Sequence, residues 1–334
     1  MTTPIHNCLI NKKTSNTPVW FMRQAGRYLP EFKKIRKNNP NFIKLCLNHK
    51  LSYEITLQPL KRFNLSAAII FSDILMTPYG LGQEVVFKKN FGPQLKPLNL
   101  YNILNNNVDE FSKKLKPIYK SIKNVKKNPL IKKKDLIGFV GAPWTLLVYM
   151  INQSSPKKGL KKNFFKDDNL IKEILKVLEK FLKIHIKNQI KNGATIIQIF
   201  DSWAGLLKEK ELEMYVYQPT LNLVNYTRSL KTPVICFPRN IKNYKKFCEI
   251  VKPDAISIDY NVNPKLIEKK IQIPVQGGLD PKILLLDKEE LKKEALKYLN
   301  IFKDHPYIFN LGHGVLPETD PNTLDYLVKL VENY

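Results

Sequence analysis

From about residue 67 onward, short apolar runs alternate with longer amphipathic stretches. Hardly any of the runs alternates apolar with polar residues, and this pattern predicts parallel strands that are buried on both faces and covered by helices. Seven runs share it: AAIIFSD (67–73), LIGFVGAP (136–143), TIIQIFDS (195–202), TPVICFP (232–238), DAISID (254–259), IPVQGGL (273–279) and YIFNLGHG (307–314). The periodicity therefore favours an α/β fold with a parallel sheet.

The amphipathic stretches between the runs predict helices. Two examples are 168–193 and 287–302, and Gly193 ends the first in the way that is usual for helices. An eighth apolar run, PVWFMR (18–23), brings the strands to the number of a single (β/α)8 TIM-type barrel. A doubly wound open sheet is the alternative fold.

Polar residues and glycines recur where the predicted strands end. In a barrel of this type the active site lies at the carboxyl ends of the strands, so these residues form the candidate site. They are Asp73, residues 141–143, Asp201, Ser202, Pro238, Arg239, Asp259, Gly277, Gly278, Gly312 and His313. The sequence holds neither GxGxxG nor GxxxxGK(S/T), so it lacks the usual cradles for a dinucleotide or a triphosphate.

The length of 334 residues suits one barrel as well as two domains. The four cysteines form no CxxC pair and no cluster with histidine, which favours reduced thiols and argues against a structural zinc site. The first residues lack the apolar segment of a signal peptide, and no apolar run reaches the ~18 residues of a membrane helix. We therefore expect a soluble, cytoplasmic protein without a membrane partner.

The net charge of +26 suggests nucleic acid, an anionic membrane or an acidic substrate as a partner. The lysines are spread along the chain together with many asparagines, and no zinc-finger spacing, RNP-type aromatic run or arginine-rich tail accompanies them. This spread is typical of solvated faces in a lysine-rich composition. We therefore expect no nucleic acid partner, and a field that attracts anions is the alternative.

Arginine is rare in this chain: only six of the 55 basic residues are arginine, yet WFMRQAGRYLP (20–30) places Arg23 and Arg27 four residues apart. An arginine fork binds a carboxylate or a phosphate through two parallel hydrogen bonds, which a lysine cannot form. The pair therefore indicates an anion site. Capping of a helix, or pairing with Glu31, explains the same two residues about equally well.

Five blocks of the sequence, read together, resemble the uroporphyrinogen decarboxylase family: PVWFMRQAGRYLPEF, FSDILMTPYGLG, GFVGAPWTLLVYM, QIFDSWAG and NLGHGVLPETDP. The similarity runs from about residue 16 to the C-terminus, and the MRQAGR and GFVGAPWT segments are highly specific to that family. The resemblance implies one barrel domain over residues 1–334, usually assembled as a homodimer. It also implies removal of the four acetate carboxyls of uroporphyrinogen III, with neither a metal nor an organic cofactor.

The resemblance assigns roles to nine residues. Asp73 and Arg23 match catalytic residues, with Asp73 as the anion that holds the pyrrole NH groups and stabilises a protonated ring. The substrate-binding set is Arg23, Gln24, Ala25, Gly26, Arg27, Asp73, Tyr149, Ser202 and His313. Arg36 matches a further family arginine, or lies on a helix surface. From the residues alone, Asp73 and Ser202 also fit helix caps. Tyr149 fits a core position, and His313 fits a hydrogen bond to a carbonyl.

A zinc-dependent methyltransferase is the rival enzyme, because cobalamin-dependent methyltransferases of the same superfamily bind zinc through His and Cys. Such a site needs two or three ligands that converge at the strand ends. Cys236 lies near one strand end without a His-x-Cys partner, and His313 stands where a thiolate would be needed. The sequence therefore argues against this alternative.

Overall fold

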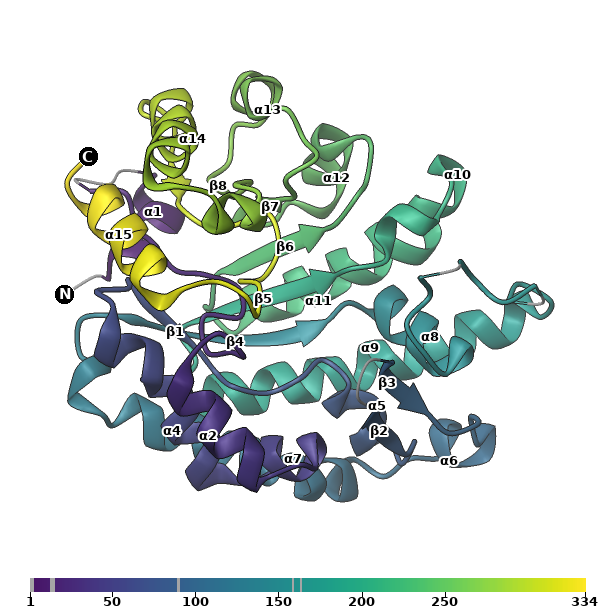
Figure 1. The fold of residues 1–334 in the computed structure, drawn as a ribbon. Helices are drawn as coiled ribbons and strands as arrows, with labels where there is room; N and C mark the ends of the chain where they lie inside the picture. The colour runs from purple at the N-terminus through teal and green to yellow at the C-terminus, as the bar shows by residue number, and fades with distance from the viewer. Residues whose placement is uncertain (1–2, 13–15, 89–90, 158, 163) are drawn as a thin grey trace.

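The computed structural model describes residues 3–12, 16–88, 91–157, 159–162 and 164–334. Seven parallel strands form one curled sheet, in the order β1-β4-β5-β6-β7-β8-β9 (Figure 1). Their bounds are β1 (Ala67–Ile69), β4 (Asp135–Gly141), β5 (Ile196–Asp201), β6 (Val234–Pro238), β7 (Ala255–Ile258), β8 (Val275–Gly277) and β9 (Tyr307–Ile308). All seven predicted strands are confirmed. The spatial order follows the chain order, so the doubly wound open sheet, which reverses its strand order, is wrong.

Helices connect the strands and cover the outside of the sheet (Figure 1). They are α1 (Pro4–Asn11), α2 (Pro30–Asn38), α3 (Phe42–Cys46), α4 (His49–Arg62), α5 (Met76–Gly80), α6 (Leu100–Leu104), α7 (Val108–Lys126), α8 (Pro143–Asn152), α9 (Asp168–Lys191), α10 (Glu209–Leu212), α11 (Gln218–Ser229), α12 (Tyr244–Val251), α13 (Pro264–Lys270), α14 (Lys288–Ile301) and α15 (Pro321–Glu332). Within the described residues, no helix is both long and apolar enough to cross a membrane.

Shorter elements make up the rest of the secondary structure in the described residues. An antiparallel hairpin, β2 (Val85–Lys88) and β3 (Gly92–Leu95), lies apart from the main sheet. Four short helical turns are η1 (Pro129–Ile131), η2 (Ala204–Leu206), η3 (Glu213–Tyr217) and η4 (Pro281–Leu285). The predicted helix over 168–193 is confirmed by α9: the Asp167 side chain accepts from the Leu170 N–H at its start, and Gly193 follows its end with φ +117°.

Side chains of the main strands alternate between two apolar clusters. In β4, Leu136 and Val140 pack toward the surrounding helices, whereas Ile137 and Phe139 belong to a second cluster inside the curled sheet. Because successive side chains of a strand point to opposite faces, both faces of these strands are covered. This is why the sequence shows apolar runs without polar alternation.

The segment at Val19 lies beside both edges of the sheet. On one side, the Phe309 N–H donates to the Pro18 carbonyl (2.8 Å) and the Trp20 N–H to the Phe309 carbonyl (3.3 Å). On the other side, the Ser66 N–H donates to the Val19 carbonyl (2.8 Å). The Val19 N–H is taken by the Ser66 hydroxyl (2.9 Å) and Pro18 has no N–H, so the ladder stops after a single bridge. The predicted eighth strand over 18–23 is therefore reduced to this bridge.

Helix α1 closes the amino-terminal end of the sheet interior. Its apolar residues Ile5, Cys8 and Leu9 belong to the inner cluster, together with Trp20, Met22, Ala67, Ile69, Ile137, Ile196, Ile235, Phe237, Ala255 and Ile308. The His6 N–H also donates to Asp135 at the start of β4 (3.3 Å). The interior is thus packed at the end where the strands begin, and the opposite end is left for a functional site.

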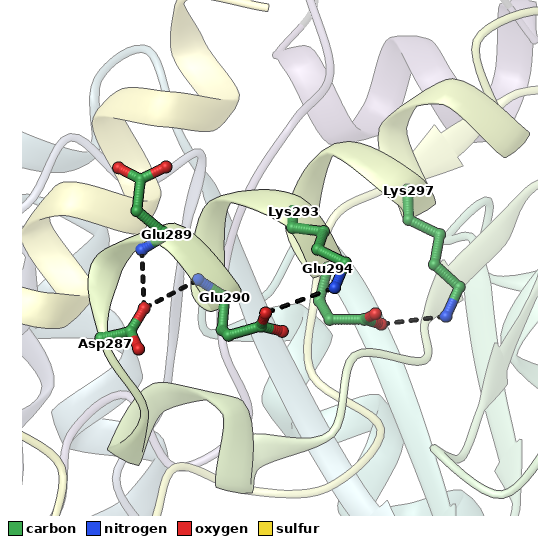
Figure 2. A network of polar contacts seen from close by, with 6 residues as sticks. All are labelled: Asp287, Glu289, Glu290, Lys293, Glu294 and Lys297. Atoms are coloured by element: carbon green, nitrogen blue, oxygen red, sulfur yellow. Dashed lines mark hydrogen bonds and ion pairs between the residues drawn. The ribbon is translucent and has the colours of Figure 1, made fainter.

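Helix α14 shows how the surface accommodates the lysine-rich composition (Figure 2). The Asp287 carboxylate accepts from the N–H groups of Glu289 and Glu290 (both 3.0 Å) and starts the helix. Further along, Lys293 pairs with Glu290 and Lys297 pairs with Glu294 at i,i+3 spacing. Exposed pairs of this kind add little stability, and they agree with lysines placed on a solvated face.

We predict that Ile5→Ala destabilises the protein strongly, because Ile5 is fully buried in the inner cluster. Loss of a buried isoleucine costs about 2–5 kcal/mol of the free energy of unfolding. Ile10 on the same helix is 55% exposed, so Ile10→Ala serves as the matched control and should change stability little. Urea denaturation of both variants measures the difference. Equal stability of the two variants would show that α1 does not pack against the sheet.

Candidate functional site

The loop that follows the Val19 segment presents the arginine pair. Arg23 lies in the left-handed backbone region, with φ +60°, which is uncommon for a residue with a side chain. The Gln24 side chain holds this turn, since it accepts from the Phe21 N–H (3.1 Å) and donates to the Ala67 carbonyl of β1 (3.0 Å). The Gln24 amide, expected to contact a substrate, is therefore occupied by the backbone and fully buried.

The loop after β9 forms hydrogen bonds with the residue before Arg23, on the other side of the turn. The Asn310 side chain accepts from the Met22 N–H (3.1 Å), and the Val315 N–H donates to the Met22 carbonyl (2.9 Å). A strained residue persists only when its surroundings over-determine it, and such residues cluster at functional sites. The bonds on both sides of Arg23 provide that support.

Two glycines make room for Arg23. A Cβ on Gly26 would stand 2.8 Å from the Arg23 carbonyl oxygen. A Cβ on Gly314 would stand 2.3 Å from Arg23 Cδ and 2.6 Å from Cγ, so the Arg23 side chain lies directly over the Gly314 backbone. Gly26 thus leaves room for the backbone of Arg23, and Gly314 leaves room for its side chain.

The six arginines divide into two groups. Arg62 pairs with Glu31 (2.6 Å) and Arg228 pairs with Asp254 (3.0 Å). Arg36 donates to the Asn39 carbonyl and lies over the Phe42 ring at 5.6 Å. In the part of the chain that the structure describes, the side chains of the remaining three, Arg23, Arg27 and Arg239, form neither an ion pair nor a hydrogen bond. The sequence alternative in which Arg23 or Arg27 pairs with Glu31 is therefore wrong.

Asp73 follows β1, and its Oδ1 accepts from the Leu75 N–H (2.9 Å) in a tight turn before α5. Burial raises the pKa of the Asp73 carboxyl to about 6, against the Leu75 N–H bond and the Arg23 charge, which both lower it. The carboxyl is thus largely ionised at neutral pH and close to a protonation change.

Arg23 is exposed to solvent, yet the pKa of its guanidinium is lowered first by burial. Solvent exposure and a burial-lowered pKa are compatible, because water reaches the Arg23 guanidinium while protein atoms surround it closely. Asp73 and Tyr149 raise the Arg23 pKa, whereas the positive charges of Arg27 and Arg239 lower it. These influences place the five residues in one electrostatic neighbourhood.

Tyr149 and His313 join this neighbourhood from two further elements. Tyr149, half-buried on α8, packs edge-on against Trp203 with ring centroids 6.0 Å apart, and burial raises the pKa of its hydroxyl. His313 is half-buried in the loop after β9, where burial, followed by the charges of Arg23 and Arg239, lowers its pKa to about 3. The imidazole is therefore neutral at physiological pH.

Ser202, Ala25 and Gly26 have fewer contacts. Ser202 follows β5 and is half-buried. Its neighbour Asp201 is buried, accepts from the Thr145 hydroxyl (2.6 Å), and has a carboxyl pKa raised by burial to about 7. Within the described residues, the N–H groups of Ala25 and Gly26 have no hydrogen-bond acceptor. Both amides therefore remain available to a ligand.

Aromatic rings on neighbouring strands form an apolar ladder on the inner face of the sheet. The Phe139 ring centroid lies 5.7 Å from that of Phe200, which lies 6.4 Å from that of Phe237, both in edge-on geometry. Sequence reasoning did not assign these residues to the site. Their alternation with outward-facing residues on β4, β5 and β6 was the available signal.

A metal site of the methyltransferase type has little support among the side chains. Across the described residues, no group of three or more His, Cys, Asp or Glu side chains could hold a metal ion. Cys236 is buried within β6, and burial raises the pKa of its thiol well above the usual value. A zinc ligand must be a thiolate, so this environment does not suit one.

The fold and the site together define an α/β enzyme with a cationic site at the carboxyl ends of its parallel strands. The model of the family "Uroporphyrinogen decarboxylase (URO-D)" matches residues 2–334. The chain belongs to the uroporphyrinogen decarboxylase family.

Two bacterial relatives illustrate the similarity. A uroporphyrinogen decarboxylase of Rickettsia bellii is 42% identical over 333 residues, covering 97% of each chain. One of a Wolbachia from Drosophila simulans is 43% identical over 328 residues, covering 97% of this chain and 96% of its own. Among solved structures, a methyltransferase from Methanosarcina mazei superposes with a TM-score of 0.81 at 15% identity, covering 100% of this chain and 99% of its own. At that identity the likeness shows the fold alone.

We predict that Gly314→Ala impairs the enzyme only through Arg23. The three nearest atoms to an added Cβ all belong to the Arg23 side chain, which would move aside, so the loss falls on activity rather than on stability. A displaced catalytic group costs up to about 100-fold in rate. A double-mutant cycle with Arg23→Ala, followed by kcat/KM, isolates the effect: in the Arg23→Ala background Gly314→Ala should cost nothing further.

Gly80→Ala is the matched control for this cycle, because its Cβ would meet the Phe111 ring at 2.6 Å instead. Its cost should be the same in both backgrounds. An equal loss of kcat/KM from Gly314→Ala with and without the Arg23 side chain would show that Gly314 does not act by leaving room for Arg23.

Proposed function

We propose that this chain is a carboxy-lyase that converts uroporphyrinogen III into coproporphyrinogen III by removing four acetate carboxyls. The observation that carries the proposal is a set of three arginines, Arg23, Arg27 and Arg239, whose side chains have neither an ion-pair nor a hydrogen-bond partner among the described residues. The charges of Arg27, Arg239 and Asp73 all act on Arg23. Uroporphyrinogen carries eight side-chain carboxylates around a flexible macrocycle with four pyrrole NH groups. A cationic wall around a single central anion matches both features.

Arg23 and Arg27 bind side-chain carboxylates of the substrate in this proposal. Each charge-assisted contact contributes about 1.5–3 kcal/mol, and the fork allows two parallel bonds to one carboxylate. The unoccupied N–H groups of Ala25 and Gly26 add neutral donors on the same loop. Gln24 contributes indirectly, since its amide fixes the turn that presents the arginines.

Asp73 supports the chemical step. Protonation of the pyrrole carbon next to an acetate creates a ring cation that accepts the electron pair of the breaking carbon–carbon bond. CO2 leaves, the exocyclic carbon takes a second proton to become the methyl group, and the proton on the ring carbon is then lost, which restores the pyrrole. A carboxylate that accepts hydrogen bonds from the pyrrole NH groups stabilises the cation by preorganised electrostatics.

Arg23 is a candidate proton donor, through its guanidinium or through a carboxyl or water that it holds. A guanidinium is normally a poor acid, but burial lowers the pKa of Arg23, which is the direction that proton donation needs. The Tyr149 hydroxyl and the Ser202 hydroxyl bind the substrate by hydrogen bonds. His313, neutral at physiological pH, donates an N–H to a propionate.

The architecture completes the proposal. The bonds of the Val19 segment to both edges of the sheet support closure into an eight-membered barrel with its active site at the carboxyl ends of the strands. We propose that residues 1–334 form a single domain, that two copies form a homodimer, and that the enzyme works in the cytoplasm.

A product analysis tests the activity. The protein is incubated with uroporphyrinogen under anaerobic conditions, the mixture is oxidised, and the porphyrins are separated by their number of carboxyl groups. The expected product has four carboxyl groups. Recovery of the eight-carboxyl porphyrin alone, from folded protein, would overturn the proposal.

We predict that Asp73→Asn lowers the single-turnover rate by about 10²- to 10³-fold, the usual loss for a preorganised electrostatic group. The asparagine oxygen still accepts from the Leu75 N–H, so the turn before α5 survives and the thermal midpoint should not fall. Substrate affinity should persist in part, because the arginines are unchanged. A variant that is destabilised but reacts at the normal rate would show that Asp73 stabilises the turn and takes no part in the reaction.

We predict an acidic limb in the pH profile of turnover. The Asp73 pKa is about 6, so the negative charge, and with it kcat, is lost as the pH falls through that value. This folded-state pKa lies above the ordinary aspartate value, so ionisation of Asp73 lowers the free energy of unfolding. The loss begins as the pH rises through the ordinary aspartate pKa and is complete above pH 6. The Asn variant should therefore be the more stable one at pH 8, by a margin that shrinks toward pH 4. A wild-type profile without this limb between pH 5 and pH 7 would contradict the assignment.

A further inference from the structure

Arg239 is held rigidly at the carboxyl end of β6. Its N–H donates to the Asp201 carbonyl (3.0 Å), and its carbonyl accepts from the Gly205 N–H (3.1 Å). A Cβ on Gly205 would stand 2.5 Å from the Asn240 carbonyl oxygen, so this close contact between the loops after β5 and β6 requires glycine. The backbone of Arg239 is thus fixed by two strand ends.

The register of β6 turns Arg239 toward the inner face. Ile235 and Phe237 belong to the inner cluster, and Arg239 is the next residue of the same alternation. Its positive charge acts on both Arg23 and His313, which come from two other loops. Arg239 therefore shares the site with the arginine pair.

No protein group satisfies this guanidinium in the described structure. The Nε atom is buried and has no hydrogen-bond partner, and no carboxylate of the described residues pairs with the side chain. Asp259, at the end of the neighbouring strand β7, is already occupied: Oδ2 accepts from the Tyr244 hydroxyl and the Asn240 N–H, and Oδ1 accepts from the Asn261 N–H (all 2.9 Å). Asp201 faces away, toward Thr145 of α8.

A buried donor without a partner is costly, and a half-buried charge beside another guanidinium is more so. Such a group is retained where a ligand supplies the missing partner. The partner must be an anion, because it has to neutralise a cation that is also repelled by the positive charge of Arg23. A carboxylate matches the planar fork in charge and in geometry.

We propose that Arg239 is a third carboxylate-binding residue of the active site, which receives one side-chain carboxylate of the substrate at the end of β6. This inference rests on the proposed function, and extends it to a strand that the arginine loop does not reach. Arg239 is a binding residue here and takes no part in proton transfer.

The test compares Arg239→Gln and Arg239→Lys with the wild type, by KM, kcat and thermal midpoint with uroporphyrinogen as substrate. Loss of one charge-assisted carboxylate contact should raise KM roughly 10- to 100-fold for Arg239→Gln, with a smaller change in kcat, because the contact persists from substrate to transition state. Arg239→Lys keeps the charge without the fork and should lie between. The midpoint should stay level or rise in Arg239→Gln, because an unsatisfied charge is removed.

Arg228→Gln is the matched control. It removes the same charge from an arginine that is exposed and paired with Asp254, so a general loss of attraction for anions would appear there equally. An unchanged KM in Arg239→Gln, a KM increase no larger than that of Arg228→Gln, or a lowered midpoint or failure to fold would each overturn the inference. Absence of four-carboxyl product from the wild type in the same assay would instead overturn the proposed function.

Discussion

Mutual repulsion of unpaired guanidinium groups is the constraint on which this structure depends. Arg23, Arg27 and Arg239 lie in one neighbourhood, in which Asp73 is the carboxylate that acts on Arg23, and like charges at short range favour separation. The backbone and its hydrogen bonds must therefore hold the three arginines close to one another. The positive φ of Arg23, the bonds of Gln24 and Asn310, and the close contacts at Gly26, Gly205 and Gly314 all supply that restraint.

The same constraint explains the distribution of polar groups around the strand ends. Asp259 accepts from the Tyr244 hydroxyl and the Asn240 N–H, and Asp201 Oδ1 accepts from the Thr145 hydroxyl. Neither carboxylate pairs with an arginine among the described residues. Carboxylates elsewhere on the surface pair with other cations, as Glu31 does with Arg62. In the proposed function this leaves the three cations available for an anion from outside, at some expense of stability, as is usual for functional sites.

The sequence predicted the seven strands well, because burial on both faces leaves apolar runs that no surface strand would show. It overestimated the eighth, because Pro18 and the Ser66 hydroxyl interrupt a ladder that composition alone cannot reveal. It missed the hairpin β2–β3, which lacks buried faces on both sides. In the site, the arginine loop and Asp73 followed from motif resemblance. Arg239 was among the candidates at the strand ends, but its unmet hydrogen-bond donor is visible only once every neighbour is placed.

Helix α1 has a kinetic consequence. It is the first helix of the chain, yet its inner-cluster contacts include Ile308 of β9, near the other end of the sequence. Contacts between residues so distant along a chain form late, because the loop between them must be ordered first. During synthesis the contacts between α1 and β9 must therefore wait until nearly all of these residues have emerged. The inner cluster is therefore complete only when β9 has joined the sheet and packed against α1, so an early and a late segment are coupled in time.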